Sequence, residues 1–367
     1  MRLYYFNTEI DIGSSGVKSF SLSQLRELTG ITQNELDQVV FDDSRTAGSP
    51  SLREVIARWW KIEDAEQVIV THGSSEGIYL IMHALLKPGD EVIVLDPCYQ
   101  QLATIAESIG CRIKVWRLRF EDGFAPKIEE FKSLISSKTR MVVVNFPHNP
   151  TGATLTATQQ KELINAVAEV GAYLVWDAAF AAMTYDHEPL PIPNLEYDRS
   201  VSLGTLSKSY GLPGLRVGWC VAPHDVIDRC IDLRDYITLH LSPLVELVAQ
   251  RAIEHADRLL EIRKQQSRNN LDILSAWIER HEGAVEWVPP QGGVCVFPRF
   301  PNFHDTESFC HRLAQEYQVL LIPGNCFTHP SYVRLGFGGS KEELTEGLSR
   351  LSSLLKRERN KMGRIRH

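Results

Sequence analysis

The sequence predicts an α/β protein with a large domain, built on a mostly parallel seven-stranded sheet, and a smaller α+β domain. Up to about residue 245, short apolar runs bounded by turn residues alternate with longer amphipathic stretches, which is typical of βα units. Beyond that point a long polar helix precedes short strand segments. The chain has 367 residues, 43% of them hydrophobic, so it can bury a core of this size.

Strands of the large domain are expected where short apolar runs end in turn residues. They cover residues 68–73, 91–97, 112–118, 141–147, 173–179, 200–206 and 216–222. In the smaller domain we expect a helix over roughly 245–281, strand segments in EWVPPQGGVCVFPRF, VLLIPG and YVRLGF, a helix near 306–317 and a final helix. The expected limits are 1–45 for an N-terminal arm, 46–245 for the large domain and 246–367 for the small domain.

Composition excludes several classes of function. The formal charge of -7 and the pI near 6.0 offer no basic face for a phosphate backbone, so we expect no nucleic-acid partner. No apolar stretch approaches the roughly 20 residues of a membrane span, so no membrane partner is expected either. The seven cysteines show no paired CxxC spacing. We therefore expect neither a disulfide framework nor a metal site, but reduced thiols in a cytoplasmic protein.

Lys208 is the central candidate for catalysis. In VSLGTLSKSYGLPGLRVGW a strand ends in Thr205, Ser207 and Lys208, and Arg216 follows a Gly-Leu-Pro-Gly turn. A lysine can form an imine with an aldehyde cofactor, while hydroxyls and a guanidinium can hold a phosphate. Alone, a Ser-Lys pair would indicate only a surface lysine, but the surrounding residues favour a cofactor site.

Two further strands end in polar residues that suit an aromatic cofactor. Asp177 ends the apolar run in VWDAAF, where a buried carboxylate is costly unless it meets a cation such as a protonated pyridine nitrogen. Asn149 follows another strand in NFPHNPTG, and its amide can donate to a phenolate oxygen. Because open α/β sheets bind ligands at the carboxyl ends of their strands, we expect these groups to meet.

Phosphate and ring contacts are expected after the first two strands. THGSSEGIYLIMHAL predicts a strand, a turn of small residues and a helix, so the backbone amides of Ser74 and Ser75 would face an anion. Tyr99 follows the next strand in VLDPCYQQL, and its ring either stacks on a pyridine or packs in the core.

Arg334 is the candidate in the smaller domain. It lies within the apolar segment YVRLGFG, and its guanidinium suits the α-carboxylate of an amino acid through paired hydrogen bonds. A structural salt bridge is the alternative.

Taken together and in this order, these motifs resemble the fold type I pyridoxal 5'-phosphate (PLP) enzymes of the class I/II aminotransferase group, which have an aspartate aminotransferase-like fold. The resemblance covers about residues 46–350. It implies a small amino-acid substrate and a homodimer with its active sites at the interface. It implies that Lys208 forms the Schiff base, that Asp177 contacts the pyridine nitrogen and that Asn149 contacts the ring oxygen. Tyr99 would stack on the ring, and Arg334 would bind the substrate carboxylate. The residues implied to bind the phosphate are Ser74, Ser75, Thr205, Ser207 and Arg216.

Two departures indicate an altered transaminase site. Common aminotransferases have a tyrosine three residues after the pyridine aspartate, where this chain has Phe180. They often send another tyrosine to the neighbouring subunit's phosphate from the segment in which this chain has Phe41.

The N-terminal arm points to a more specific activity. Its segment NTEIDIGSSGVKSFSLSQLREL resembles the start of arginine cyclases of the capreomycidine synthase and enduracididine synthase type, which convert hydroxylated arginines into cyclic guanidino amino acids. A carboxylate suits a guanidinium, and either Glu9 or Asp11 could supply one. Glu9 and Ser15 are the residues expected to reach the substrate. An ordered arm that only closes the dimer is the alternative.

These motifs predict a PLP-dependent lyase/cyclase that dehydrates and cyclises a hydroxylated arginine in specialised metabolism. Its catalytic residues would be Lys208, Asp177 and Glu9, and its substrate would contact Arg334, Glu9 and Ser15. The alternative is a PLP-dependent amino-acid aminotransferase, which would use every one of the same cofactor residues. A PLP-binding regulator without catalysis is disfavoured, because the sequence shows no DNA-binding segment.

Overall fold

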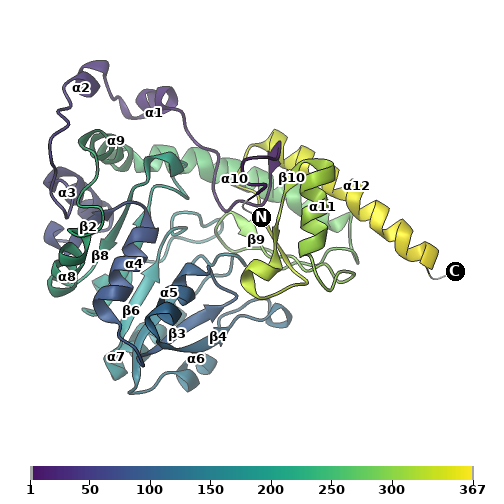
Figure 1. Cartoon of the computed structure of the whole chain (residues 1–367), viewed down its shortest axis with the longest axis horizontal. Helices are drawn as coiled ribbons and strands as arrows, with labels where there is room; N and C mark the ends of the chain where they lie inside the picture. The colour runs from purple at the N-terminus through teal and green to yellow at the C-terminus, as the bar shows by residue number, and fades with distance from the viewer. Residues whose placement is uncertain (1–2, 366–367) are drawn as a thin grey trace.

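A seven-stranded sheet forms the centre of the larger part of the molecule (Figure 1). The computed structural model describes the backbone of residues 3–365 and the side chains of residues 3–360. The strand order is β2-β8-β7-β6-β5-β3-β4; β8 is antiparallel to both neighbours and the other pairs are parallel. The predicted fold class is therefore confirmed. The strands are β2 (Val68–Thr71), β3 (Glu91–Asp96), β4 (Arg112–Arg117), β5 (Thr139–Asn145), β6 (Tyr173–Asp177), β7 (Ser200–Thr205) and β8 (Gly218–Val221).

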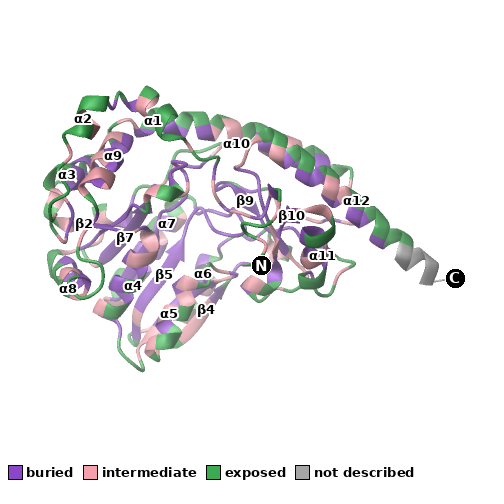
Figure 2. Cartoon of the chain, turned by 45° about the horizontal axis from the view of Figure 1, so that its top comes forward, coloured by how far each residue is buried: buried purple, intermediate pink, exposed green. Residues whose placement is uncertain are grey.

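Helices cover both faces of this sheet, and this explains why its strands are apolar on both sides. In β3, for example, Val92 and Val94 pack with the helices of one face, and Ile93 and Leu95 with those of the other. Figure 2 shows buried strands between helices that are buried only on their inner sides. One face carries α4 (Ser74–Leu85), α5 (Gln101–Ile109) and α8 (His224–Arg234); the other carries α6 (Ile128–Leu134), α7 (Ala157–Val170), α3 (Pro50–Trp59) and α9 (Pro243–Glu254).

The prediction of a single helix over residues 245–281 is wrong, because the chain forms two helices there. They are α9 and α10 (Ala256–Glu279), and His255 between them has φ -116° and ψ 26°. Val248 in α9 packs into the core of the larger part, whereas Trp277 near the end of α10 lies in the core of the smaller part. Because Leu259 and Leu260 at the start of α10 also lie in the core of the larger part, α10 itself connects the two cores.

The smaller part contains a short antiparallel sheet with helices around it. Its strand order is β11-β12-β9, and the expected helix near 306–317 is present as α11. The expected domain limits stay predictions. The elements are β9 (Cys295–Val296), α11 (Glu307–Tyr317), β11 (Ile322–Pro323), β12 (Val333–Gly336) and α12 (Lys341–Ile365). None of the helices described between residues 3 and 365 has the length and apolar character needed to cross a membrane.

The N-terminal arm is built into the smaller part. Its strand β1 (Ile10–Asp11) pairs in parallel with β10 (Val319–Leu320), and Ile10 and Ile12 lie in the core of the smaller part. Figure 1 shows the described start of the arm, in purple, beside β10. The arm then crosses to the larger part, where Phe20 N donates to the Gly211 carbonyl at 3.0 Å, and continues into α1 (Leu22–Thr29) and α2 (Gln33–Asp37).

Candidate active site

The carboxyl edge of the large sheet gathers the predicted site residues. Asn145 and Asp177 are register partners at the ends of β5 and β6, and Lys208 follows β7. Because β8 runs in the opposite direction, its start lies at the same edge, and Thr205 is paired with Gly218. The parallel strands therefore bring together side chains that are far apart in the sequence.

Lys208 is partly buried at this edge, and its amine contacts the arm. Its Nζ donates to Ser15 Oγ at 3.2 Å. Burial, together with the charge of Arg334, lowers the pKa of the amine to about 8 against the opposing effects of Cys295 and Asp177. A neutral amine is therefore accessible near neutral pH, as a nucleophile or a base requires.

Asp177 presents a buried carboxylate that lacks a full counter-charge. Its Oδ1 accepts a hydrogen bond from Ala179 N at 3.0 Å. Burial raises the pKa of Asp177 to about 6, although this hydrogen bond and the charge of Lys208 oppose the shift. The position suits a cationic partner such as a protonated ring nitrogen.

A chain of hydrogen bonds connects the Asp177 end of the site to Arg334. Asn145 Nδ2 donates to the Asp177 carbonyl at 2.9 Å, and Asn145 Oδ1 accepts from Asn149 N at 2.8 Å. Arg334 Nη1 lies 3.4 Å from Asn149 Oδ1 and Nε donates to the Gly13 carbonyl at 3.0 Å. The prediction missed Asn145, although its place at the end of β5, four residues before Asn149, was a usable signal.

The phosphate cradle has the expected elements. Ser74 and Ser75 open α4, so their backbone amides lie in its first turn, where no helical carbonyl precedes them. The Arg216 guanidinium lies over Gly73, where a Cβ would come within 2.5 Å of its Nη2 atom, and its Nη1 donates to Ser207 Oγ at 3.1 Å. The Thr205 hydroxyl donates to the Val217 carbonyl at 3.0 Å, so its proton is already bound by the backbone.

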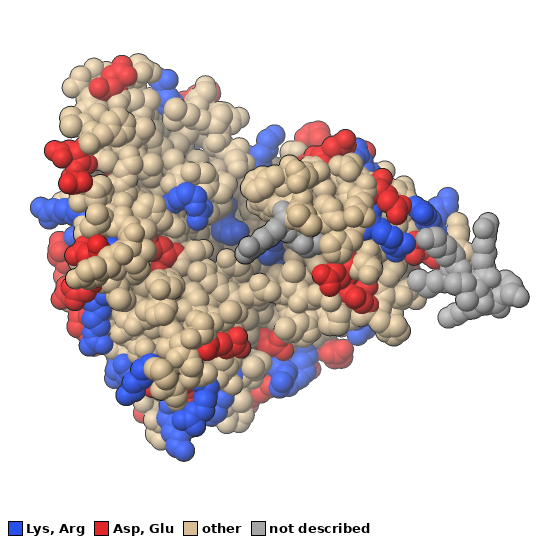
Figure 3. Space-filling model, viewed as in Figure 1, with Lys and Arg blue, Asp and Glu red and all other residues tan. Residues whose placement is uncertain are grey.

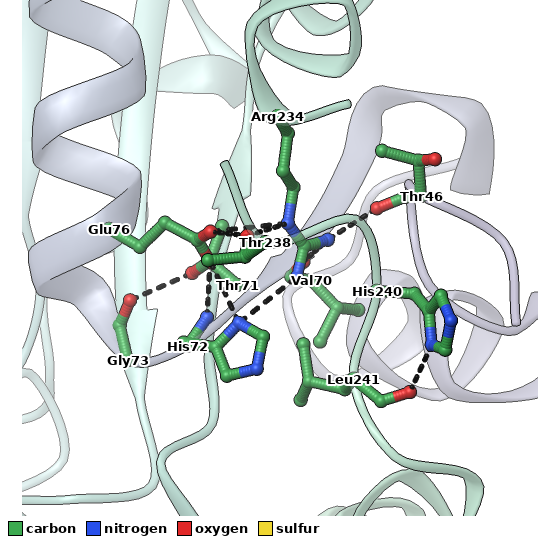
Figure 4. Close-up of polar contacts among 10 residues, drawn as sticks. All are labelled: Thr46, Val70, Thr71, His72, Gly73, Glu76, Arg234, Thr238, His240 and Leu241. Atoms are coloured by element: carbon green, nitrogen blue, oxygen red, sulfur yellow. Dashed lines mark hydrogen bonds and ion pairs between the residues drawn. The ribbon is translucent and has the colours of Figure 1, made fainter. Parts of the chain in front are cut away.

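A buried ion pair behind the cradle fixes the first turn of α4. Arg234 of α8 is fully buried, donates to the Val70 carbonyl at 2.6 Å and pairs with Glu76 Oε1 at 3.3 Å. Burial would raise the pKa of Glu76, but hydrogen bonds from His72 and Thr238 and the charge of Arg234 lower it to about 2. Figure 4 shows these side chains converging between β2, α4 and the segment after α8.

Three aromatic residues singled out in the sequence have different surroundings. Tyr99 follows β3 and is 37% exposed, so its ring is not part of the core. Phe180 is buried in a small apolar cluster with Val17 of the arm, and Phe41 is 74% exposed.

The structure does not bring Glu9 to this site. Its carboxylate pairs with Arg350 of α12 at 2.9 Å, and its side chain is 65% exposed. The physical reason is the register of the arm: Ile10 is buried in the core of the smaller part, which turns the side chain of its neighbour Glu9 outward. The expected position of Glu9 beside the substrate is therefore wrong within this chain, whereas Ser15 does reach Lys208.

These residues fit PLP. Arg216, Ser207 and the α4 amides would hold its phosphate, and glycine at position 73 leaves room for the guanidinium. Asp177 would supply a charge for the pyridine nitrogen, and Lys208 would supply an amine for the aldehyde. Figure 3 shows a hollow between the larger and smaller parts, with basic side chains inside it.

Comparisons with known proteins agree with this fit. The profile of the family "Aminotransferase class I and II" matches residues 32–351. Capreomycidine synthase from Streptomyces vinaceus is 43% identical over 97% of this chain and 92% of its own length. Aspartate aminotransferase from Pyrococcus horikoshii is 30% identical over 95% of this chain and 92% of its own length.

Two solved structures are also similar to this chain. A PLP-dependent cyclase, OrfR, superposes with a TM-score of 0.92 and 42% identity, covering 97% of this chain and 95% of its own. A PLP-dependent aminotransferase from Streptococcus suis gives a TM-score of 0.91 and 34% identity, covering 97% of this chain and 96% of its own. The chain therefore belongs to the class I and II aminotransferase family, and its cofactor is PLP.

Proposed function

We propose that this chain is a PLP-dependent lyase/cyclase that removes water from a hydroxylated arginine and closes a cyclic guanidino amino acid of the capreomycidine or enduracididine type. The observation that carries the proposal is the 43% identity to capreomycidine synthase over 97% of the chain. Aspartate aminotransferase from Pyrococcus horikoshii covers a similar share of the chain but is only 30% identical, so the higher identity favours the cyclase.

Each proposed catalytic role follows from the surroundings of a residue. Arg334 lies at the junction of the arm and Asn149, where its guanidinium can bind the α-carboxylate of the substrate. The Lys208 amine holds the cofactor and, when released, takes the α-proton. Asp177 keeps the ring nitrogen protonated. The cofactor, when bound, stores the electron pair left at the α-carbon.

The net reaction balances as the loss of one water molecule. The bond between the side-chain carbon and its hydroxyl breaks, and the hydroxyl leaves with a proton as water. A guanidine nitrogen then forms a bond to that carbon and loses one proton, while a proton returns to the α-carbon. No external oxidant or reductant is consumed.

An aminotransferase is the second candidate, because aspartate aminotransferase from Pyrococcus horikoshii is 30% identical over 95% of this chain. The two activities use the same cofactor residues. They differ in products, because amino transfer requires a keto-acid acceptor and releases a keto acid, whereas cyclisation requires no acceptor and releases water.

The decisive experiment measures both products in one assay. The purified protein is incubated with β- and γ-hydroxyarginine, with and without pyruvate, and the products are identified by mass spectrometry and NMR; Lys208→Ala serves as the inactive control. We expect an acceptor-independent cyclic product. A keto acid that forms only with pyruvate, and no dehydration of either isomer, would replace the cyclase by the aminotransferase.

We also propose a homodimer in the cytoplasm. Support for the dimer comes from apolar side chains at the surface, among them Phe41 at 74% and Tyr236 at 91% exposure, and from the few charged side chains around the hollow in Figure 3. Support for the compartment comes from the seven cysteines, all of which are free thiols.

A further inference from the structure

The amine of Lys208 is held by the arm. The Ser15 hydroxyl lies 3.2 Å from Lys208 Nζ, and Ser15 is only 3% exposed. We propose that Ser15 is a positioning residue that orients the free amine of Lys208 for proton transfer. This inference rests on the proposed role of Lys208 as the cofactor lysine and base.

The backbone around Ser15 is fixed on both sides, as an orienting group requires. Before it, the Gly13 carbonyl accepts from Arg334 Nε at 3.0 Å. After it, Lys18 N donates to the Gly338 carbonyl at 2.9 Å. Gly336 in β12 allows the close approach, because a Cβ there would overlap the Ser14 carbonyl oxygen. The hydroxyl is therefore presented from a rigid support.

Ser14, the neighbour of Ser15, has a different structural role. Asp11 accepts hydrogen bonds from Gly13 N at 2.8 Å and Ser14 N at 2.9 Å, and the Ser14 hydroxyl donates to its second oxygen at 2.5 Å. Ser14 thus closes a turn within the arm, while Ser15 reaches into the site. The two adjacent serines provide a matched pair for mutation.

Removing the Ser15 oxygen has two expected consequences. The amine loses the acceptor that fixes its direction, and misplacement of a reacting group by about 1 Å costs on the order of a hundredfold in rate. The ammonium form also loses a hydrogen bond. The other charged or titratable groups that act on Lys208 are Arg334, Arg216, Asp177 and Cys295, and the mutation leaves all four in place. The pKa of Lys208 should therefore fall further in Ser15→Ala.

Two readouts test the proposal. The first is exchange of the α-proton of arginine with deuterium oxide, which needs the base but no leaving hydroxyl. The second uses cofactor-free protein and follows the pH dependence of the rate at which added PLP produces its lysine-bound visible absorption band. This second readout reports the neutral amine without turnover.

We expect Ser15→Ala to slow exchange by about tenfold to a hundredfold, with little change in the arginine concentration at half-saturation, and to shift the PLP-capture profile to lower pH. Ser15→Thr, which keeps a hydroxyl, should restore both. Ser14→Ala should change neither.

Three outcomes would overturn the proposal: unchanged exchange and profile in Ser15→Ala, equal losses in Ser14→Ala, or a loss that Ser15→Thr does not restore while that variant retains its unfolding temperature. Because arginine has no hydroxyl to lose, the result is independent of cyclisation. A failure of the cyclase assay and a failure of the Ser15 inference are thus distinguishable.

Discussion

Asp177 carries a charge that the folded chain compensates poorly without its cofactor. Because burial raises its pKa from 3.8 to about 6, the folded state binds more protons than the unfolded state between these values. Stability of the cofactor-free protein therefore falls as the pH rises from about 4 to 6 and then stays level, at a total cost of about 3 kcal/mol.

We expect Asp177→Asn to stabilise the cofactor-free protein by up to about 3 kcal/mol at pH 7 and by little at pH 4, because the amide cannot ionise. Urea unfolding at both pH values measures this. The same variant should lose most α-proton exchange when PLP is bound. An equal stability change at both pH values would contradict the interpretation.

Single residues also show which parts of the candidate site could be predicted from the sequence and which could not. Lys208, Asp177 and Asn149 could be predicted because each follows an apolar strand, and strand ends of a parallel sheet share one edge. The pairing of Arg234 with Glu76 could not be predicted, since it joins two amphipathic helices without any shared sequence period. Glu9 was misplaced because its side chain direction depends on pairing with β10, more than 300 residues away.

Among elements, the contact between α4 and α8 combines apolar packing with the buried pair of Glu76 and Arg234. Removing the arginine would leave the carboxylate, whose side chain is 9% exposed, without its cation. Since the pKa of Glu76 is lowered from 4.5 to about 2, this carboxylate contributes stability that is present above about pH 4.5 and is lost as the pH falls toward 2.

We expect Arg234→Met to lower the free energy of unfolding by about 3 kcal/mol or more at pH 7, and by less at pH 3, where the unfolded carboxylate is protonated. Arg229→Met is the matched control on the same helix. Arg229 Nη2 lies 3.5 Å from Asp225 Oδ2, and both side chains of this pair are about half exposed. Removal of Arg229 should therefore change the free energy of unfolding by less than about 1 kcal/mol. Equal effects of the two variants in urea unfolding would refute the structural role.

The arm and β12 meet at Gly336, where a Cβ would overlap the Ser14 carbonyl. Gly336→Ala should therefore push the arm from the site, destabilise the protein by about 1–3 kcal/mol and reduce turnover. Gly16→Ala is the control within the arm, because a Cβ there meets nothing within 4 Å. Thermal unfolding measures the change in stability, and the cyclisation assay measures the change in turnover. Full activity of Gly336→Ala would show that the arm tolerates displacement.

For the whole molecule, the apolar surface residues predict self-association. Tyr236, Ile237 and Leu239 are 91%, 51% and 52% exposed, and they follow the helix whose Arg234 anchors the cradle. An interface there would place the second copy near the phosphate site, and exposed aromatic residues commonly dominate such interfaces.

Tyr236→Asp should weaken the dimer by about tenfold or more, because a charge would be buried in the interface. Sedimentation at several concentrations measures the equilibrium. Leu195→Asp, at another exposed apolar position, should leave it unchanged. A wild-type chain that sediments as a monomer at every concentration would exclude the dimer.

The pairing of β1 with β10 has a consequence during protein synthesis. Ile10 and Asp11 leave the ribosome first, but their partners Val319 and Leu320 follow about 300 residues later. At typical elongation rates the arm waits roughly 15–60 s for its partner strand. The large sheet, with Lys208 at its edge, is already synthesised by then. The β1–β10 pair can therefore form only after every strand of the large sheet has been synthesised, which makes its closure a late step of folding.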